Sequence, residues 1–95
     1  MQDFYVYILK CSDNSYYVGH TDNIEKRLSD HAQGLSGYTK SRLPIILVYM
    51  QTFSSRDEAF VIERKIKNWT RNKKEAFITG DWKKISTLEI GRAHV

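Results

Sequence analysis

The sequence has few of the features that cross-link a chain or anchor it in a membrane. Its 95 residues include a single cysteine, Cys11, so neither a disulfide framework nor a cysteine-based zinc site is expected. No apolar run approaches the roughly 20 residues that a membrane-spanning helix needs. The N-terminus lacks the basic and then apolar pattern of a signal peptide. These absences predict a protein of the reducing cytoplasm that does not contact a membrane.

Acidic residues are also in short supply relative to basic ones. The chain has 15 Lys and Arg against 11 Asp and Glu, a formal net charge of +4. Such an excess favours polyanionic partners, of which phosphate backbones are the commonest. No internal repeat, low-complexity segment or linker divides the chain, and 41% hydrophobic content is enough for one core. The composition therefore predicts one small domain with a bias towards nucleic acid.

The pattern along the chain predicts an α+β fold with the order β-β-α-β-α-α. Residues 4–10 and 16–20 are rich in aromatic and β-branched side chains, typical of the two strands of a hairpin. Residues 43–53 predict a third strand, apolar enough to be central to the sheet, with Pro44 at its start. The three strands are expected to form a small mixed or antiparallel sheet with helices packed on it.

The first predicted helix has signals at both ends. It falls within residues 21–34, where Thr21 or Asp22 can cap its start and Gly34 can end it. Ile24, Leu28 and Ala32 recur every four residues and are expected to form its buried stripe.

Residues 54–69 predict the second helix, which Ser55 and Glu58 open as a capping box. A further helix over 72–80 ends at Gly80, and residues 81–87 are expected to close the domain by folding Trp82 back onto it. The single domain is thus assigned to residues 1–88. Residues 89–95 have neither periodicity nor a cap, and they back-translate onto a common sequencing-adapter sequence. We expect them to be an unstructured tail, which is either a product of sequencing or cloning or an ordinary disordered terminus.

Four of the six tyrosines lie in the predicted hairpin, namely Tyr5, Tyr7, Tyr16 and Tyr17. The length of the turn decides whether Tyr7 and Tyr17 meet, because a change of register parity moves side chains to the other face. A three-residue loop over 13–15 places both phenols on one face, and a two-residue loop over 13–14 places them on opposite faces. The sequence is compatible with either loop.

Two polar features of the predicted helices could carry chemistry. Glu63 lies within or beside the apolar stripe of its helix, where an ionised carboxylate needs a metal ion or a salt bridge with Arg64, Lys67 or another element. Arg27 and His31 are four residues apart on one helix face. They form either a solvated surface pair or a phosphate clamp beside a group that exchanges a proton near neutral pH.

Basic residues cluster late in the chain, with two tryptophans, Trp69 and Trp82, interleaved among them. This cluster is either a solvated helix face with packed tryptophans or a groove that follows a phosphate backbone. The cluster consists of Arg64, Lys65, Lys67, Arg71, Lys73, Lys74, Lys83 and Lys84.

Several of these residues fall into one ordered pattern. Residues 5–7 read Tyr-Val-Tyr, and residues 17–19, nine residues later, read Tyr-Val-Gly. Arg27, His31 and Glu63 follow in order. This pattern resembles the GIY-YIG nuclease domain over residues 4–85, and it looks closest to the small stand-alone bacterial members of that family. The resemblance implies a three-stranded antiparallel sheet flanked by helices.

The resemblance also implies roles in phosphodiester hydrolysis. Tyr7 and Tyr17 would orient or deprotonate the attacking water, Arg27 would neutralise charge on the phosphate, and His31 would transfer a proton. Glu63 would bind a single divalent cation, Mg²⁺ or Mn²⁺. A tyrosine has an ordinary pKa near 10, so it acts as a base only beside positive charge, which Arg27 and the cation are expected to supply.

Gly19 would act as a structural turn residue that lets the backbone come close at the end of the second strand. The chain departs from the family pattern at His20, where many members have lysine, and around Glu75, where some members have asparagine.

The expected function is therefore metal-dependent endonuclease cleavage of DNA, in repair or in the processing of branched or damaged substrates, with RNA left open as a substrate. The alternative is a catalytically weak nucleic-acid-binding module that keeps the nuclease fold, and a third reading is an interaction domain. The residues expected to contact nucleic acid are His20, Lys40, Arg42, Lys67, Arg71 and Lys73.

Overall fold

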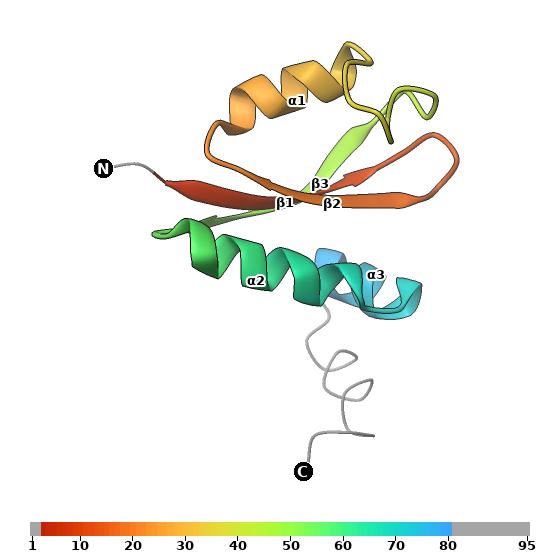
Figure 1. Ribbon diagram of the computed structural model, residues 1–95. Helices are drawn as coiled ribbons and strands as arrows, with labels where there is room; N and C mark the ends of the chain where they lie inside the picture. Colours follow the sequence, from red (N-terminus) through yellow and green to blue (C-terminus); the bar gives the residue numbers. More distant parts are fainter. Residues whose placement is uncertain (1–2, 81–95) are drawn as a thin grey trace.

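The computed structural model describes residues 3–80 and contains three strands and three helices in that range (Figure 1). In chain order the elements are β1 (Phe4–Lys10), β2 (Tyr16–Thr21), α1 (Ile24–Ala32), β3 (Ile46–Phe53), α2 (Arg56–Lys67) and α3 (Arg71–Thr79). The predicted order β-β-α-β-α-α is therefore confirmed. The predictions for residues 81–87, including Trp82, and for the tail over 89–95 lie outside the described residues.

The three strands form an antiparallel sheet with the order β2-β1-β3. β1 is thus the central strand, and the prediction that the third strand would be central is wrong. Ile46, Leu47 and Met50 of β3 are exposed. Their apolar character therefore marked a partly uncovered edge of the sheet.

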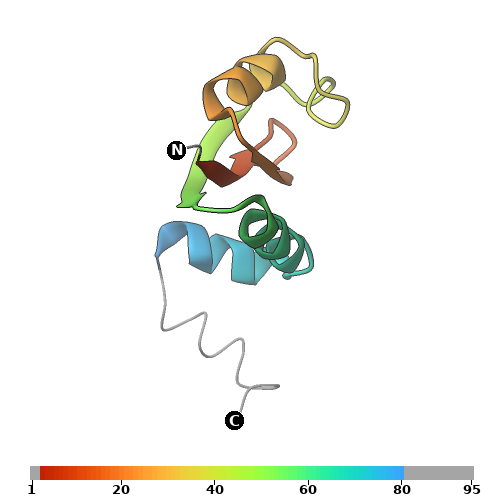
Figure 2. The same cartoon turned by 60° about the vertical axis from the view of Figure 1, so that its left-hand side comes forward.

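The helices cover the two faces of the sheet unequally, with α1 on one face and α2 and α3 on the other (Figures 1 and 2). The main core lies under α2, where Val6, Ile8 and Val18 of the sheet pack with Ala59 and Ile66. Within residues 3–80, no helix is long and apolar enough to cross a membrane. The opposite face, under α1, receives the odd-numbered side chains of β1, including Tyr7.

The hairpin between β1 and β2 has an odd-length turn. The backbone N–H of Cys11 donates to the carbonyl of Ser15 at 2.9 Å, which leaves three loop residues over 12–14. Asn14 adopts the left-handed conformation (φ 68°) that asparagine tolerates. The loop begins one residue earlier than the three-residue alternative over 13–15, and its odd length places Tyr7 and Tyr17 on the same face of the sheet.

The start of α1 differs from the prediction. Asn23 is the N-cap, and its side chain accepts from the backbone N–H of Lys26 at 3.1 Å. Thr21 instead accepts from the N–H of Asn23 at 3.0 Å, which shapes the turn into the helix. Gly34 has φ +75° and ends the helix as predicted.

The inward face of α1 also differs. Ile24 and Leu28 are half-buried as expected, but Ala32 is exposed and His31 is fully buried. A strict four-residue spacing runs ahead of the helical period of about 3.6 residues, so the third member of the predicted stripe has rotated away from the sheet. The polar His31 takes the inward position, which makes α1 a helix that buries a functional group.

The N-cap of α2 and the C-terminal end of α3 follow the prediction. Ser55 is the N-cap of α2 and accepts from the N–H of Glu58 at 3.2 Å. Thr70 caps α3, and Gly80 ends it in the left-handed conformation (φ 77°). Ala59, Glu63 and Ile66 are the buried residues of α2, so the carboxylate lies in the apolar stripe as predicted.

Candidate active site

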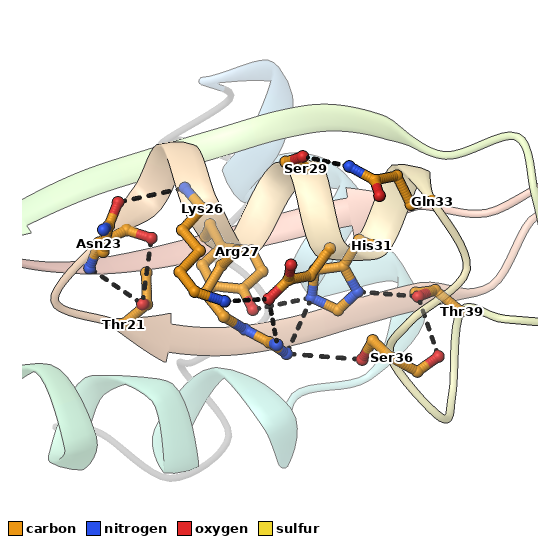
Figure 3. Close-up of polar contacts among 11 residues, drawn as sticks. Thr21, Asn23, Lys26, Arg27, Ser29, His31, Gln33, Ser36 and Thr39 are labelled. Carbon is orange, nitrogen blue, oxygen red and sulfur yellow. Dashed lines mark hydrogen bonds and ion pairs between the residues drawn. The ribbon is translucent and has the colours of Figure 1, made fainter.

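Four predicted site residues meet between α1 and the sheet, and we call Tyr7, Tyr17, Arg27 and His31 the phenol–imidazole cluster. The Tyr7 hydroxyl lies 3.0 Å from Nε2 of His31, and Nη2 of Arg27 lies 3.3 Å from the same nitrogen. The Tyr17 ring is centred 4.9 Å from the His31 ring and 6.3 Å from the Tyr7 ring. Arg27 and His31 point from consecutive turns of α1 towards the sheet (Figure 3).

Gly19 makes room for Tyr7 from inside β2, directly opposite Tyr7 in the strand register. A Cβ atom at this position would lie 2.6 Å from the Tyr7 hydroxyl oxygen and 3.1 Å from the Tyr17 ring. The prediction of a turn residue is therefore wrong. Because Gly19 has no side chain, the Tyr7 ring fits beside it. The prediction had given a different reason for glycine here, namely a close approach of the backbone.

Burial dominates the acid–base properties of the Tyr7 phenol, which is 1% exposed. It raises the pKa of Tyr7 to about 12, although hydrogen bonding and charge from Arg27 oppose the shift. The charges of Tyr17 and Glu63 raise that pKa further. The positive charge of Arg27 alone does not offset burial, so at neutral pH the phenol holds its proton.

His31 has the opposite tendency. Its ring is fully buried, and burial together with the nearby positive charge of Arg27 lowers its pKa, although Asp30 partly opposes this. The imidazole is therefore neutral at pH 7 and can accept a proton. A protonated phenol faces a neutral imidazole at hydrogen-bond distance, which is the arrangement that a proton transfer requires.

Glu63 lies on the other side of the sheet, in what we call the carboxylate cluster of His20, Glu63 and Lys67. Glu63 is 6% exposed, and its carboxylate bonds Nδ1 of His20 from β2 and Nζ of Lys67, the latter at 2.6 Å. The salt bridge that the sequence left open as an alternative is thus present. A pocket of about 340 Å³ opens beside the carboxylate and is lined by Phe60, Glu63, Arg64, Lys67 and Asn68.

The donor set decides which metal ion the carboxylate cluster could hold. Within residues 3–80, no group of three or more His, Cys, Asp and Glu side chains gathers as a metal site. A zinc or calcium cage, which needs several protein ligands, does not fit. A largely hydrated Mg²⁺ or Mn²⁺ fits, because such an ion takes one or two carboxylates and completes its shell with water and phosphate oxygens. Lys67, half-exposed at the rim, would have to release Glu63.

The residues predicted to contact nucleic acid differ in how accessible they are. His20 and Lys67 bond Glu63, as described above. Lys40 is exposed, whereas Arg42 pairs with Asp13 at 3.0 Å. Arg71 pairs with Glu75 at 3.3 Å and remains accessible. Lys73 is 4% exposed with its ammonium 4.4 Å from the centre of the Trp69 ring, so burial removes it from the predicted contact surface.

Three residues that the sequence analysis did not select lie against the phenol–imidazole cluster, and all come from the loop after α1. The hydroxyl of Thr39 lies 2.8 Å from Nδ1 of His31, and Arg27 donates to the hydroxyl of Ser36 at 3.5 Å (Figure 3). The Tyr38 ring is centred 5.5 Å from that of Tyr17. Residues of a loop follow no periodic pattern that would single them out in the sequence. The one available signal was that the loop after the helix of His31 is rich in short polar residues.

Tyr5 and Tyr16, the other two tyrosines of the hairpin, lie outside the phenol–imidazole cluster. Tyr16 packs against the main core on the α2 side of the sheet, and its hydroxyl donates to Glu75 of α3 at 3.4 Å. Arg71 lies over the same ring at 4.8 Å from its centre. Tyr5 is half-buried. Two of the four clustered phenols thus lie in the candidate site and a third serves the core.

Comparison with known proteins places this geometry in a family. The model of the GIY-YIG catalytic domain matches residues 3–76. A UPF0213 protein of Staphylococcus haemolyticus is 48% identical over 75 residues, which are 78% of this chain and 92% of that protein. A UPF0213 protein of Natronomonas pharaonis is 39% identical over 80 residues, 83% of this chain and 94% of that protein.

Two solved structures resemble the fold. The solution NMR structure of a UPF0213 protein from Bacillus halodurans has a TM-score of 0.56 and 40% identity, covering 81% of this chain and 83% of that one. The solution NMR structure of a protein from E. faecalis has a TM-score of 0.58 and 32% identity, covering 100% and 97%. The domain match and these relatives show that the chain belongs to the GIY-YIG family, among its small stand-alone UPF0213 proteins.

Proposed function

We propose that this protein is a divalent-metal-dependent endonuclease that hydrolyses phosphodiester bonds in DNA. GIY-YIG domains are generally nucleases, which supports the reaction class. The observation that carries the proposal is the hydrogen bond between Tyr7 and His31 beside the guanidinium of Arg27. This arrangement joins a proton path to a phosphate-binding group.

The proton path follows from the two pKa shifts. Tyr7, with a pKa of about 12, cannot hold a negative charge at neutral pH while it waits for water. It accepts a proton from the attacking water only as it passes its own proton to Nε2 of His31. The O–H bond of water breaks, the phenol is restored, and the oxygen of the water attacks phosphorus. General-base catalysis of this kind contributes about 10²- to 10⁴-fold to a rate.

Arg27 supplies the second part of the chemistry. Its guanidinium presents a planar fork of donors that matches two phosphate oxygens and stabilises charge on the transferring group. An ion pair with Asp30, at 3.7 Å, restrains the Arg27 side chain and leaves it partly exposed. Arg27 also repels the proton that His31 has gained, which favours release of that proton after the step.

Glu63 is the residue that would hold the divalent cation. When bound there, the cation would polarise a phosphoryl oxygen and stabilise the departing oxygen. The charge of Glu63 already acts on the Tyr7 phenol, which links the carboxylate cluster electrostatically to the proton path. Exposed Lys40 and accessible Arg71 support binding of the polyanionic backbone.

The test is a cleavage assay on labelled single-stranded, duplex, flapped and branched DNA and on RNA, with Mg²⁺ or Mn²⁺ and with a chelator. Glu63→Gln removes the charge of the metal ligand and keeps its volume. Asp57→Asn, an exposed position on the same helix, is the matched control. We expect metal-dependent cleavage by the wild type and by Asp57→Asn, and no cleavage by Glu63→Gln.

Two outcomes would contradict the proposal in different ways. Normal metal-dependent cleavage by Glu63→Gln would remove Glu63 from the metal site. Salt-sensitive binding to the same panel without cleavage by the wild type would favour the nucleic-acid-binding module. In that case the contacts of Glu63 with His20 and Lys67 would be its only role.

A further inference from the structure

The imidazole of His31 is held at both nitrogens by protein groups. Nε2 faces the Tyr7 hydroxyl at 3.0 Å and Nη2 of Arg27 at 3.3 Å, while Nδ1 faces the Thr39 hydroxyl at 2.8 Å. His31 and Thr39 are each 0% exposed, so solvent does not reach either ring nitrogen through these neighbours. The tautomer of His31 is therefore set by these three side chains.

The donors and acceptors around the ring are consistent with one neutral tautomer. A guanidinium can only donate, so Nε2 beside Arg27 must be the unprotonated nitrogen that accepts. The proton of the neutral ring is then on Nδ1, which donates to Oγ1 of Thr39. Thr39 in turn donates its own hydroxyl proton to the carbonyl of Ser36, which lies 3.5 Å away. Every polar hydrogen in this chain of groups has an acceptor.

The loop that carries Thr39 is fastened on both sides of it. The N–H of Lys40 donates to the carbonyl of Ser36 at 2.9 Å, and the N–H of Arg42 donates to the carbonyl of Thr39 at 2.9 Å. The N–H of Ser12, in the β1–β2 turn, donates to the carbonyl of Arg42 at 2.9 Å. Thr39 is thus held in place by the same hairpin that carries Tyr7.

We propose that Thr39 is a positioning residue whose hydroxyl keeps the proton of His31 on Nδ1, so that Nε2 stays open to the proton of Tyr7. If the ring held its proton on Nε2, Tyr7 would face a donor and could not pass its proton on. The kinetic part of this inference rests on the proposed nuclease activity. The tautomer itself does not.

The experiment compares the wild type with Thr39→Val, which keeps the shape and removes the hydroxyl, and with Thr39→Ser, which keeps the hydroxyl. Long-range ¹⁵N–¹H NMR correlation spectra at neutral pH report which nitrogen of His31 carries the proton. We expect the Nδ1–H tautomer in the wild type and in Thr39→Ser, and an increased Nε2–H population in Thr39→Val. Single-turnover cleavage by Thr39→Val should fall about 10- to 100-fold, the range for loss of an outer-shell partner, with little change in KM.

The Nε2–H tautomer in the wild type would overturn the inference, and so would an unchanged tautomer and rate in Thr39→Val. Should Thr39→Val fail to fold, the wild-type and Thr39→Ser spectra still decide between the two tautomers. Should no protein cleave, the proposed function fails, while the expected tautomer shift in Thr39→Val would still support the role of Thr39.

Discussion

Substitution of Gly19 by alanine tests whether the space beside Tyr7 is needed for the site. The added Cβ atom would lie 2.6 Å from the Tyr7 hydroxyl oxygen and 2.8 Å from Cζ. Carbon atoms and their neighbours are normally about 3.5–4.0 Å apart, so the ring must retreat by about 1 Å. Tyr7 is 1% exposed on the central strand, so this movement disturbs packed neighbours.

The size of the effect follows from that displacement. Forcing extra volume into a packed site costs about 1–3 kcal/mol of stability. For a domain of this length, that lowers the melting temperature by about 4–8 °C per kcal/mol. A shift of 1 Å also breaks the 3.0 Å contact between Tyr7 and His31. Misplacement on this scale costs about 100-fold in rate.

The assay pairs thermal unfolding by circular dichroism with single-turnover cleavage of the preferred substrate. Gly37→Ala is the matched control, because a Cβ atom at Gly37 would meet nothing within 4 Å. In the double variant Gly19→Ala, Tyr7→Phe, loss of the hydroxyl relieves the closer contact, so part of the lost stability should return without the activity. A Gly19→Ala protein as stable and as active as Gly37→Ala would refute the reasoning.

Three further predictions concern charge. Arg27→Lys should lower the single-turnover rate by about 10²- to 10³-fold, the effect of losing one oriented transition-state donor, and a wild-type rate would make Arg27 a surface residue. Lys67→Met should raise Mn²⁺ affinity about fivefold in titration calorimetry, because it removes the ammonium that lies 2.6 Å from Glu63 and competes with the ion. A half-exposed ion pair of this kind is worth about 1 kcal/mol, which the ion no longer has to overcome. The exposed Lys65→Met is its control, and equal affinities would contradict the competition. Burial and Arg27 lower the pKa of His31 below the ordinary 6.5, so the folded state takes up this proton less readily than the unfolded chain. That contribution to stability is complete above pH 6.5 and is lost as pH falls below it, so urea midpoints from pH 7.5 to 5 should fall more steeply for the wild type than for His31→Gln.

Local patterns were good guides to the elements of the fold, and poor guides to their neighbours in space. Ser55, Gly34 and Gly80 act where their backbone chemistry predicts, because caps depend on residues within one turn. Whether the third strand is central or at an edge depends on which strands pair. The apolar character of Ile46 and Met50 carries no information about that pairing. Edge and central strands of similar composition therefore look alike in a sequence.

In the site, too, the sequence pattern indicated which residues take part but not how they contact one another. The ordered pattern of tyrosines, arginine, histidine and glutamate identified the four residues of the phenol–imidazole cluster and Glu63 of the carboxylate cluster. The contact of Thr39 with His31 joins a loop to a helix, and the raised pKa of Tyr7 depends on how much protein surrounds the phenol. Both are products of packing, and packing is a property of the assembled fold.

The alternation of side chains along β2 has a structural consequence. Tyr17 and Gly19 face the phenol–imidazole cluster, whereas His20, between Gly19 and Thr21, faces the carboxylate cluster. β2 is a six-residue edge strand that pairs with β1 alone in the sheet. The pairing of β2 with β1 thus fixes the position of both clusters relative to the central strand. A ligand that contacted both clusters would therefore bind on both sides of β2.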